Sequence, residues 1–228
     1  MKNLLFIFLL CFCSLSLCGQ SAYWNCSNIK VDDSERLVKA FDQYFATDLA
    51  QNMPTVVLSQ IVNRNTTLQA THQVCILTTD PSDFDNMSSN FANAEAQVLG
   101  MIWDDEVEVV STVMGTPLIF NPNNLGNGYS NIFSLDVESP QTVASAFGEL
   151  ATAMSGVTLE LHAAISGAEN HVTHYIVARA ENLAKYLENR NKVISSDAFA
   201  TYMEKAGGSY ELINVFATRL LKTYNGPE

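Results

Sequence analysis

The side chains best suited to chemistry in this sequence form a short acidic segment, Asp104-Asp105-Glu106-Val107-Glu108. If this segment is helical, Asp104 and Glu108 are four residues apart and share a face, with Asp105 beside them. Like charges at this spacing repel each other, so a bound cation would relieve an electrostatic cost. The segment therefore predicts a cation-binding surface, and the alternative is a solvated acidic face without a ligand.

The histidines offer a second set of metal ligands. His171 and His174 are three residues apart, which would place both imidazoles on one face of a helix and allow them to bind a metal ion together. The alternative is that they are structural or merely exposed, as many isolated helix histidines are. His162 is interpreted as a helix-surface residue, and His72 is assigned no role.

The overall charge limits the classes of partner. The chain holds 24 acidic and 12 basic residues, for a formal net charge of −12. Such an excess of acid argues against nucleic acid or an anionic membrane as the natural partner. With 47% hydrophobic and 16% charged residues, the chain has the composition of a folded domain with a sizeable core, not of a disordered chain.

The first nineteen residues have the pattern of a secretory signal peptide. Lys2 precedes an apolar run, Leu4 to Leu17, and the small residue Gly19 follows. The run is short for a membrane span, so we expect cleavage near Gly19, a secreted protein and one mature domain over residues 20–228. The mature charge would be −13, because the segment contains one lysine and no acid.

Two cysteines, Cys26 and Cys75, remain after that cleavage. In an oxidising compartment an intrachain disulfide between them is the default, and separate bonds to partner subunits are the alternative. Three sequons, beginning at Asn25, Asn65 and Asn86, permit glycosylation, and Asn65 and Asn86 are the candidates we retain.

The elements that would position these groups have the apolar spacing of helices. Residues recur at intervals of three and four in windows of about 33–55, 86–114, 139–165 and 170–205, and a shorter window covers 209–223. The third window has the cleanest stripe, and Ser139-Pro140 precedes it as a cap and a proline that a first helical turn accepts. A segment rich in Gly, Asn and Pro, Gly115 to Glu138, separates the second and third windows. One all-α architecture requires so long a connection, a four-helix bundle with a single crossover.

At this point the sequence resembles the ferritin family. The segment Thr158 to Ala163, TLELHA, is similar to the end of the third ferritin helix, and His171 to Ile176 resembles the start of the fourth. Further similarities are Asn90-Phe91-Ala92, Met114-Gly115 through Ile119-Phe120, Tyr44 to Val62, and the short last helix at Ser209 to Phe216. Together with the signal peptide and the mature cysteines, these motifs are most similar to secreted, arthropod-type subunits.

The resemblance implies a cage subunit that stores iron as ferric mineral. Its ferroxidase ligands would fall at Asp48, near Met101 and Asp104, near Ala151 with Glu149 two residues away, and near Ala184. Since the Glu-x-x-His pair of the active subunits is missing, the resemblance is to the light type, which lacks ferroxidase activity. The expected metal-contacting residues are then Asp48, Asp104, Asp105, Glu108 and Glu149.

The resulting interpretation is a secreted light-chain-like ferritin subunit. It would co-assemble with homologous heavy-type subunits and nucleate ferric mineral, without a complete ferroxidase centre of its own. One alternative is a ferritin subunit with residual di-iron chemistry at Asp48, Asp104 and Glu149. The other is an extracellular helical-bundle protein that binds an apolar ligand.

Overall fold

The computed structural model describes residues 22–226 apart from 65–67, 91–95 and 170. The predicted signal peptide therefore lies outside the described residues. Helices and strands alternate along the chain instead of forming a bundle. The first half contains β1 (Tyr23–Val31), α1 (Ser34–Phe45), η1 (Asp48–Asn52), β2 (Thr55–Asn63), β3 (His72–Thr78), α2 (Ser82–Asn90), α3 (Gln97–Glu106) and β4 (Val107–Ile119).

The second half repeats the same order of elements. It contains η3 (Pro122–Asn124), β5 (Tyr129–Val137), α4 (Pro140–Ala153), β6 (Thr158–Ser166), β7 (His174–Ala180), α5 (Leu183–Ile194), α6 (Asp197–Ala206) and β8 (Tyr210–Tyr224). Each half thus has the β-α-β-β-α-β order of a ferredoxin-like unit.

The strands of the two units close into one barrel in the order β1-β3-β2-β8-β5-β7-β6-β4. Within each unit the order is that of a ferredoxin-like sheet, β4-β1-β3-β2 and β8-β5-β7-β6. The units join where β2 pairs with β8 and where β4 pairs with β6, and each of these pairings is antiparallel. Closure leaves the paired strands without the open edges of a flat sheet.

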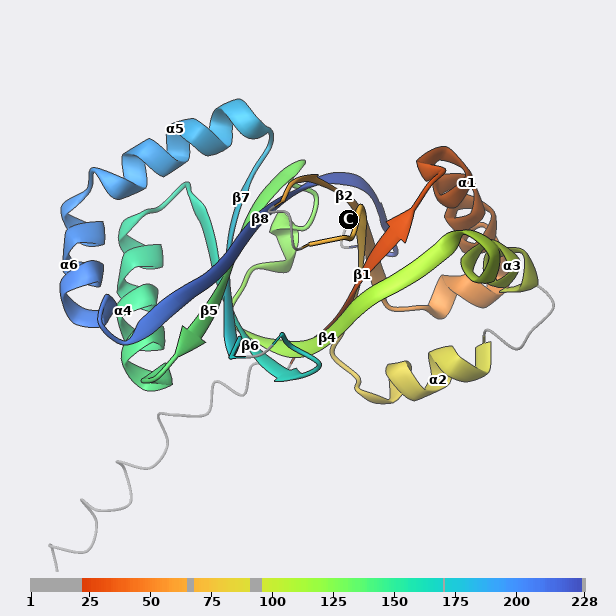
Figure 1. Ribbon diagram of the computed structural model, residues 1–228, viewed down its shortest axis with the longest axis horizontal. Helices are drawn as coiled ribbons and strands as arrows, with labels where there is room; N and C mark the ends of the chain where they lie inside the picture. Colours follow the sequence, from red (N-terminus) through yellow and green to blue (C-terminus); the bar gives the residue numbers. More distant parts are fainter. Residues whose placement is uncertain (1–21, 65–67, 91–95, 170, 227–228) are drawn as a thin grey trace, which may run out of the picture.

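The helices cover the outside of the barrel in two groups. Figure 1 shows α1, α2 and α3 on one side of the barrel and α4, α5 and α6 on the other. Outward-facing strand residues pack under each group, including Ile29 and Leu58 in the first unit and Leu135 and Leu161 in the second. The hydrophobic core is therefore two layers between strands and helices, and the barrel interior is a separate compartment.

A local hydrogen-bond pattern repeats with the units. Thr71 precedes His72 at the start of β3, and Thr173 precedes His174 at the start of β7. In each pair the threonine Oγ1 lies 2.9 Å from the histidine Nδ1. The same hydroxyl accepts from the backbone N–H of the last residue of β1 or β5, at 2.9 Å in both units. Both imidazoles are buried, so each unit is fixed in the same way at the start of its third strand.

The predicted all-α four-helix bundle is wrong, and the spacing of apolar residues explains the error. Val157, Leu161 and Ile165 are four residues apart, which suits a helix, but four is also an even number. In a strand, residues at even spacing share a face. The structure places Leu161 and Ile165 in β6, so the third window is a helix followed by a strand. The last window, with Leu212 and Leu220, is β8 for the same reason.

The predicted crossover and fifth helix are also wrong. The segment from 115 to 138 contains the end of β4, η3 and all of β5. The residues rich in Asn and Gly between 121 and 128 form only the short connection between the two units. Among the described residues, no helix is both long enough and apolar enough to span a bilayer.

Candidate ligand cavity

The five carboxylates expected to bind iron do not converge in the structure. Asp48 is in η1, Asp104 and Asp105 are in α3, Glu108 is in β4, and Glu149 is in α4 on the other side of the barrel. All five are exposed. The described residues contain no group of three or more His, Cys, Asp or Glu side chains that could hold a metal ion.

Most of these acids have ordinary surface partners. Glu149 accepts from Lys205 of α6 at 2.6 Å, Glu108 accepts from Lys30 of β1 at 3.2 Å, and Asp48 accepts from Gln51 at 3.1 Å. These are exposed contacts that contribute little to stability. They fit the alternative of a solvated acidic surface.

The histidine pair does not share a helix face. His171 is exposed in the loop before β7, 3.9 Å from a carboxylate oxygen of Asp136, whereas His174 is buried on β7. Of the retained sequons, Asn86 is exposed on α2, and Asn65 lies outside the described residues.

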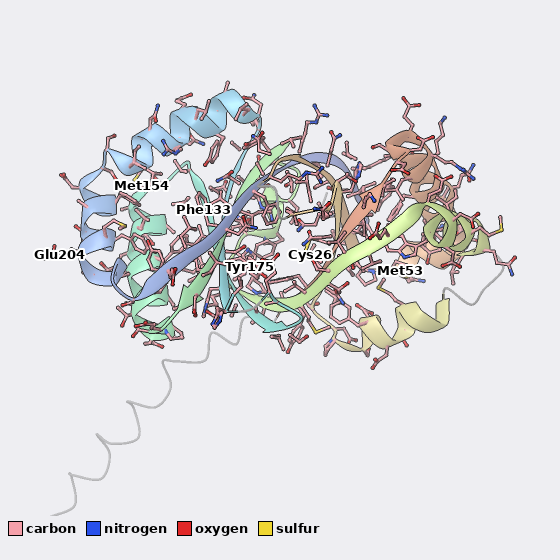
Figure 2. All side chains as sticks on the ribbon, viewed as in Figure 1. Cys26, Met53, Phe133, Met154, Tyr175 and Glu204 are labelled. Atoms are coloured by element: carbon pink, nitrogen blue, oxygen red, sulfur yellow. A yellow bond between two sulfur atoms is a disulfide. The ribbon has the colours of Figure 1, made fainter. Side chains whose placement is uncertain are left out.

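Cys26 of β1 and Cys75 of β3 form a disulfide between adjacent strands. The two residues are directly opposite each other in the register of this pair. Both line the inside of the barrel, and Figure 2 labels Cys26 there. The disulfide is therefore part of the wall of an interior cavity.

That cavity occupies the middle of the barrel. The space open to the centre of a water molecule is about 110 Å³. Because one water needs roughly 10–15 Å³ of such space, the cavity has room for several waters or one small ring-bearing molecule. Its walls are mainly apolar and come from both units: Trp24, Val57, Leu68, Leu77, Val113, Phe120, Leu125, Ile132, Val177 and Phe216.

Aromatic rings gather in one part of this wall. The rings of Trp24 and His162 meet edge to face with centroids 6.0 Å apart, and Tyr175 meets Trp24 at 5.8 Å. The rings of Phe120 and His162 also meet edge to face, with centroids 5.9 Å apart. Trp24 fits because Gly115 is opposite it on β4, where any β carbon would collide with the indole.

A buried ion pair is next to these rings. Arg179 of β7 donates from Nε to both carboxylate oxygens of Glu160 on β6, at 3.0 Å each, and from Nη1 to the hydroxyl of Ser130 on β5 at 3.2 Å. The side chain of Glu160 is 1% exposed, whereas that of Arg179 is 15% exposed and lines the cavity. The carboxylate thus lies behind the guanidinium, which is the group a ligand would meet.

Opposing effects set the charge of this pair. Burial raises the pKa of Glu160, but the charge of Arg179 and the hydrogen bond from His162 outweigh burial, so the net pKa is lowered. Glu160 is therefore a carboxylate, and Nε2 of His162, 3.2 Å from its Oε2, carries the proton of their hydrogen bond. When the His162 ring carries a single proton, that proton is therefore on Nε2, and Nδ1 has an acceptor lone pair.

A smaller polar group lies on the wall of the first unit. Gln73 donates to Asn28 at 2.9 Å, and Asn28 donates to Ser111 at 3.1 Å. These three side chains come from β3, β1 and β4 and all line the cavity. They satisfy one another across the strands. The cavity lining also includes the polar side chains of Ser59, Ser134, Glu169, Asn214 and Thr218.

Sequence reasoning missed this site although a signal was present. In Leu159-Glu160-Leu161-His162 polar and apolar residues alternate, which is the pattern of a strand with one polar face. The segment was instead matched to a ferritin helix. Arg179 is between Ala178 and Ala180 and carries no comparable signal, because its partner is nineteen residues away in the sequence.

The sequence matches no protein-family model and no curated protein. Solved structures do match the fold. A proposed monooxygenase from Lactobacillus acidophilus has a TM-score of 0.63 at 11% identity, over 89% of this chain and 95% of that one. A proposed chlorite dismutase has a TM-score of 0.55 at 6% identity, over 89% and 95% of the two chains. A heme-binding protein from Thermus thermophilus has a TM-score of 0.53 at 9% identity, over 89% and 92%.

At these identities the likeness shows a shared α+β barrel fold and no more. It is enough to correct the family assignment, since these barrels have nothing of the ferritin bundle. The light-chain ferritin function, the ferric mineral cage and the heavy-type partner subunits are wrong for this chain. The alternatives of a residual ferritin ferroxidase and of a helical-bundle binder are wrong too, because each requires that bundle.

The described residues do not fit a heme. Heme iron needs an axial His, Cys, Met or Tyr ligand and a slot for the porphyrin. In the cavity wall, Nδ1 of His162 is sealed from solvent in the ligand-free barrel, and both cysteines are in the disulfide. Burial, and to a lesser extent the charge of Glu169, raises the pKa of Tyr175 to about 12, which disfavours the phenolate that iron would bind. Eight-stranded barrels also leave an interior just wide enough for side chains or one small ligand.

The other place for a heme, between strands and helices, is filled. In the second unit Leu135, Phe147, Leu150, Leu161 and Tyr202 form a continuous buried cluster. We therefore base no chemistry on heme.

Proposed function

We propose that the protein binds a small, uncharged, ring-bearing organic molecule inside the barrel. The observation that carries this proposal is the cavity itself, a mainly apolar space enclosed by strands of both units with one accessible guanidinium, that of Arg179. Concave apolar sites with few polar groups are the usual form of small-molecule sites.

The size and lining of the cavity define the ligand. Room for several waters suits one or two fused rings, and the aromatic wall offers faces and edges for stacking. Transfer of the ring from water to this wall would supply most of the affinity.

The ion pair defines the polar group of the ligand. Arg179 uses Nε for Glu160 and Nη1 for Ser130, while Nη2 has no hydrogen-bond partner in the described part of the chain. Because Glu160 already balances the guanidinium charge, a second carboxylate would be left unneutralised in the cavity. A neutral acceptor such as a carbonyl or nitro oxygen suits Nη2 better.

Nitrobenzene tests the proposal, since it combines one ring with neutral acceptor oxygens. Isothermal titration calorimetry should find one site per chain in the wild-type protein. Val177→Trp, which places an indole in the cavity, should abolish binding. Val62→Trp, on an exposed position of β2, is the matched control and should bind as the wild type does. Circular dichroism would establish that both variants fold. Equal binding by folded Val177→Trp, or no binding by the wild type, would refute the proposal.

We further infer that the protein acts after export. The N-terminal pattern of residues 1–19 supports this, and a disulfide is typical of oxidising compartments. Expression in a secretory host followed by N-terminal sequencing of the product tests it. A mature chain that begins near Gln20 is expected, and an intact Met1 in the secreted fraction, or retention in the cell, contradicts the inference.

A further inference from the structure

Two polar atoms of the cavity wall are buried without a hydrogen-bond partner in the described chain, Nε1 of Trp24 and Nδ1 of His162. The two side chains are 7% and 6% exposed, and their rings are in contact. Buried polar groups are nearly always paired, so each unpaired atom indicates a missing partner. Two such atoms on adjacent rings indicate one missing group.

The chemistry of the two atoms specifies that group. The indole Nε1–H can only donate a hydrogen bond. Since Nε2–H of His162 is directed at Glu160, Nδ1 of the neutral ring can only accept one. A partner for both must accept from Trp24 and donate to His162, and a hydroxyl does both.

We propose that the cavity ligand carries an aromatic hydroxyl that binds between Trp24 and His162, and that His162 takes its proton. This rests on the proposed function and deepens it by naming a phenol as the ligand class. Both nitrogens are sealed from solvent in the ligand-free barrel, so one of the two rings turns when the phenol binds.

The proton transfer is balanced within the site. The phenolic O–H bond breaks, its proton moves to Nδ1 of His162, and its electron pair stays on the oxygen as a phenolate. The imidazolium formed is adjacent to the Glu160 carboxylate, and the phenolate accepts from Trp24 Nε1–H. No other reactant is required. His162 is the catalytic base, and Glu160 is a positioning residue that fixes its tautomer.

The other groups facing His162 do not supply this proton acceptor. On its own strand the facing group is Glu160, which is already occupied by Arg179. Tyr175 is opposite His162 in the register of β6 and β7, and its raised pKa keeps it protonated. Trp24 from β1 and Phe120 from the segment after β4 do not titrate.

Three matched probes test the proposal: nitrobenzene, 4-nitrophenol and 4-nitroanisole. The first lacks the hydroxyl, and the third can accept but not donate. Calorimetry on the wild type should show that 4-nitrophenol binds roughly three- to tenfold more tightly than either of the others, the effect of one or two additional hydrogen bonds. Trp24→Phe and His162→Phe should each reduce this preference, measured as the ratio of the 4-nitrophenol affinity to the nitrobenzene affinity of the same variant.

The absorbance of nitrophenolate reports the proton itself. Bound 4-nitrophenol should ionise at lower pH than free 4-nitrophenol in the wild type and in Trp24→Phe, but not in His162→Phe. If nitrobenzene does not bind, the proposed function fails. If nitrobenzene binds and 4-nitrophenol binds no better, or if the bound phenol ionises as it does in water, the hydroxyl subsite fails alone and its polar atoms serve an internal water.

Discussion

Replacing Arg179 by methionine should lower the free energy of unfolding, because the buried carboxylate of Glu160 loses its charged partner. The substitution keeps the length of an apolar stem but removes the charge that holds Glu160 ionised. Glu160 would keep its contact with His162 and lose both 3.0 Å bonds from the guanidinium. A buried charge without its partner is among the few lesions that destabilise a domain severely.

The expected magnitude follows from burial. Removing one member of a buried pair costs about 3–5 kcal/mol. Glu160 is 1% exposed, so little solvent screening reduces this figure. In a domain of this size it corresponds to a loss of roughly 6–20 °C in melting temperature. The double variant Arg179→Met with Glu160→Gln should recover much of the loss, because no charge is then buried.

The pH dependence gives a sharper test. In the wild type the folded pKa of Glu160 is lowered, so its contribution to stability is present above the unfolded pKa near ~4.3 and is lost as pH falls through the folded pKa. Without Arg179, burial would raise the folded pKa, and the sign reverses. The deficit of the variant should therefore be small near pH ~4 and should grow as the pH rises towards 7.

Urea unfolding of the three proteins at several pH values is the assay. Arg219→Met is the matched control, because Arg219 is exposed and pairs with Gln60 at the surface. It should change stability by less than about 0.5 kcal/mol at any pH. A deficit for Arg179→Met that is equally small, that is independent of pH, or that the double variant shares in full would refute the reasoning.

Three further predictions concern the framework. Burial lowers the pKa values of His72 and His174, at the starts of β3 and β7. The free energy of unfolding in urea should therefore fall as the pH drops below about 6.5, and replacing both residues by glutamine should reduce this pH dependence. An unchanged pH dependence in the double variant would contradict this prediction. Serine at both Cys26 and Cys75 should cost about 2–5 kcal/mol by chemical denaturation, because the bond closes a separation of 49 residues in the unfolded chain; equal stability with and without reductant in the wild type would count against this. Gly115→Ala should cost about 1–3 kcal/mol through collision with Trp24, whereas Gly148→Ala on α4 meets only ordinary contact and should be neutral or stabilising; equal melting temperatures for the two variants would contradict the packing.

Helix starts are the local features that the sequence indicated best. Asp33 precedes α1 and accepts from the backbone N–H of Arg36 at 3.0 Å. Pro140 opens α4 as expected, but the side chain of Ser139 makes no capping hydrogen bond there. A capping residue needs only a polar side chain within three residues of the first helical turn, so a helix start can be predicted from the local sequence. The ends of the helices could not be predicted in this way, because apolar residues continue at a spacing of four from α4 into β6.

The candidate site, like the fold, was not predicted from the sequence. Glu160 and His162 are close in sequence, and their alternation with leucines indicated a polar face of a strand. Nothing local indicated that Trp24 from the start of the chain would pack against that face. That contact depends on barrel closure, in which β1 pairs with β4 and β4 pairs with β6.

The sequence by itself determined the acidic surface, the composition of a folded domain and the starts of two helices, α1 and α4, because these depend on residue type or on neighbours within a few positions. Tertiary structure decided which apolar segments are strands, that two ferredoxin-like units close one barrel, and that Glu160, His162, Arg179 and Trp24 share its interior. The physical reason is that strand pairing and closure are contacts between distant residues. An apolar interval of four satisfies a helix and a strand equally until a partner strand exists to select one of them.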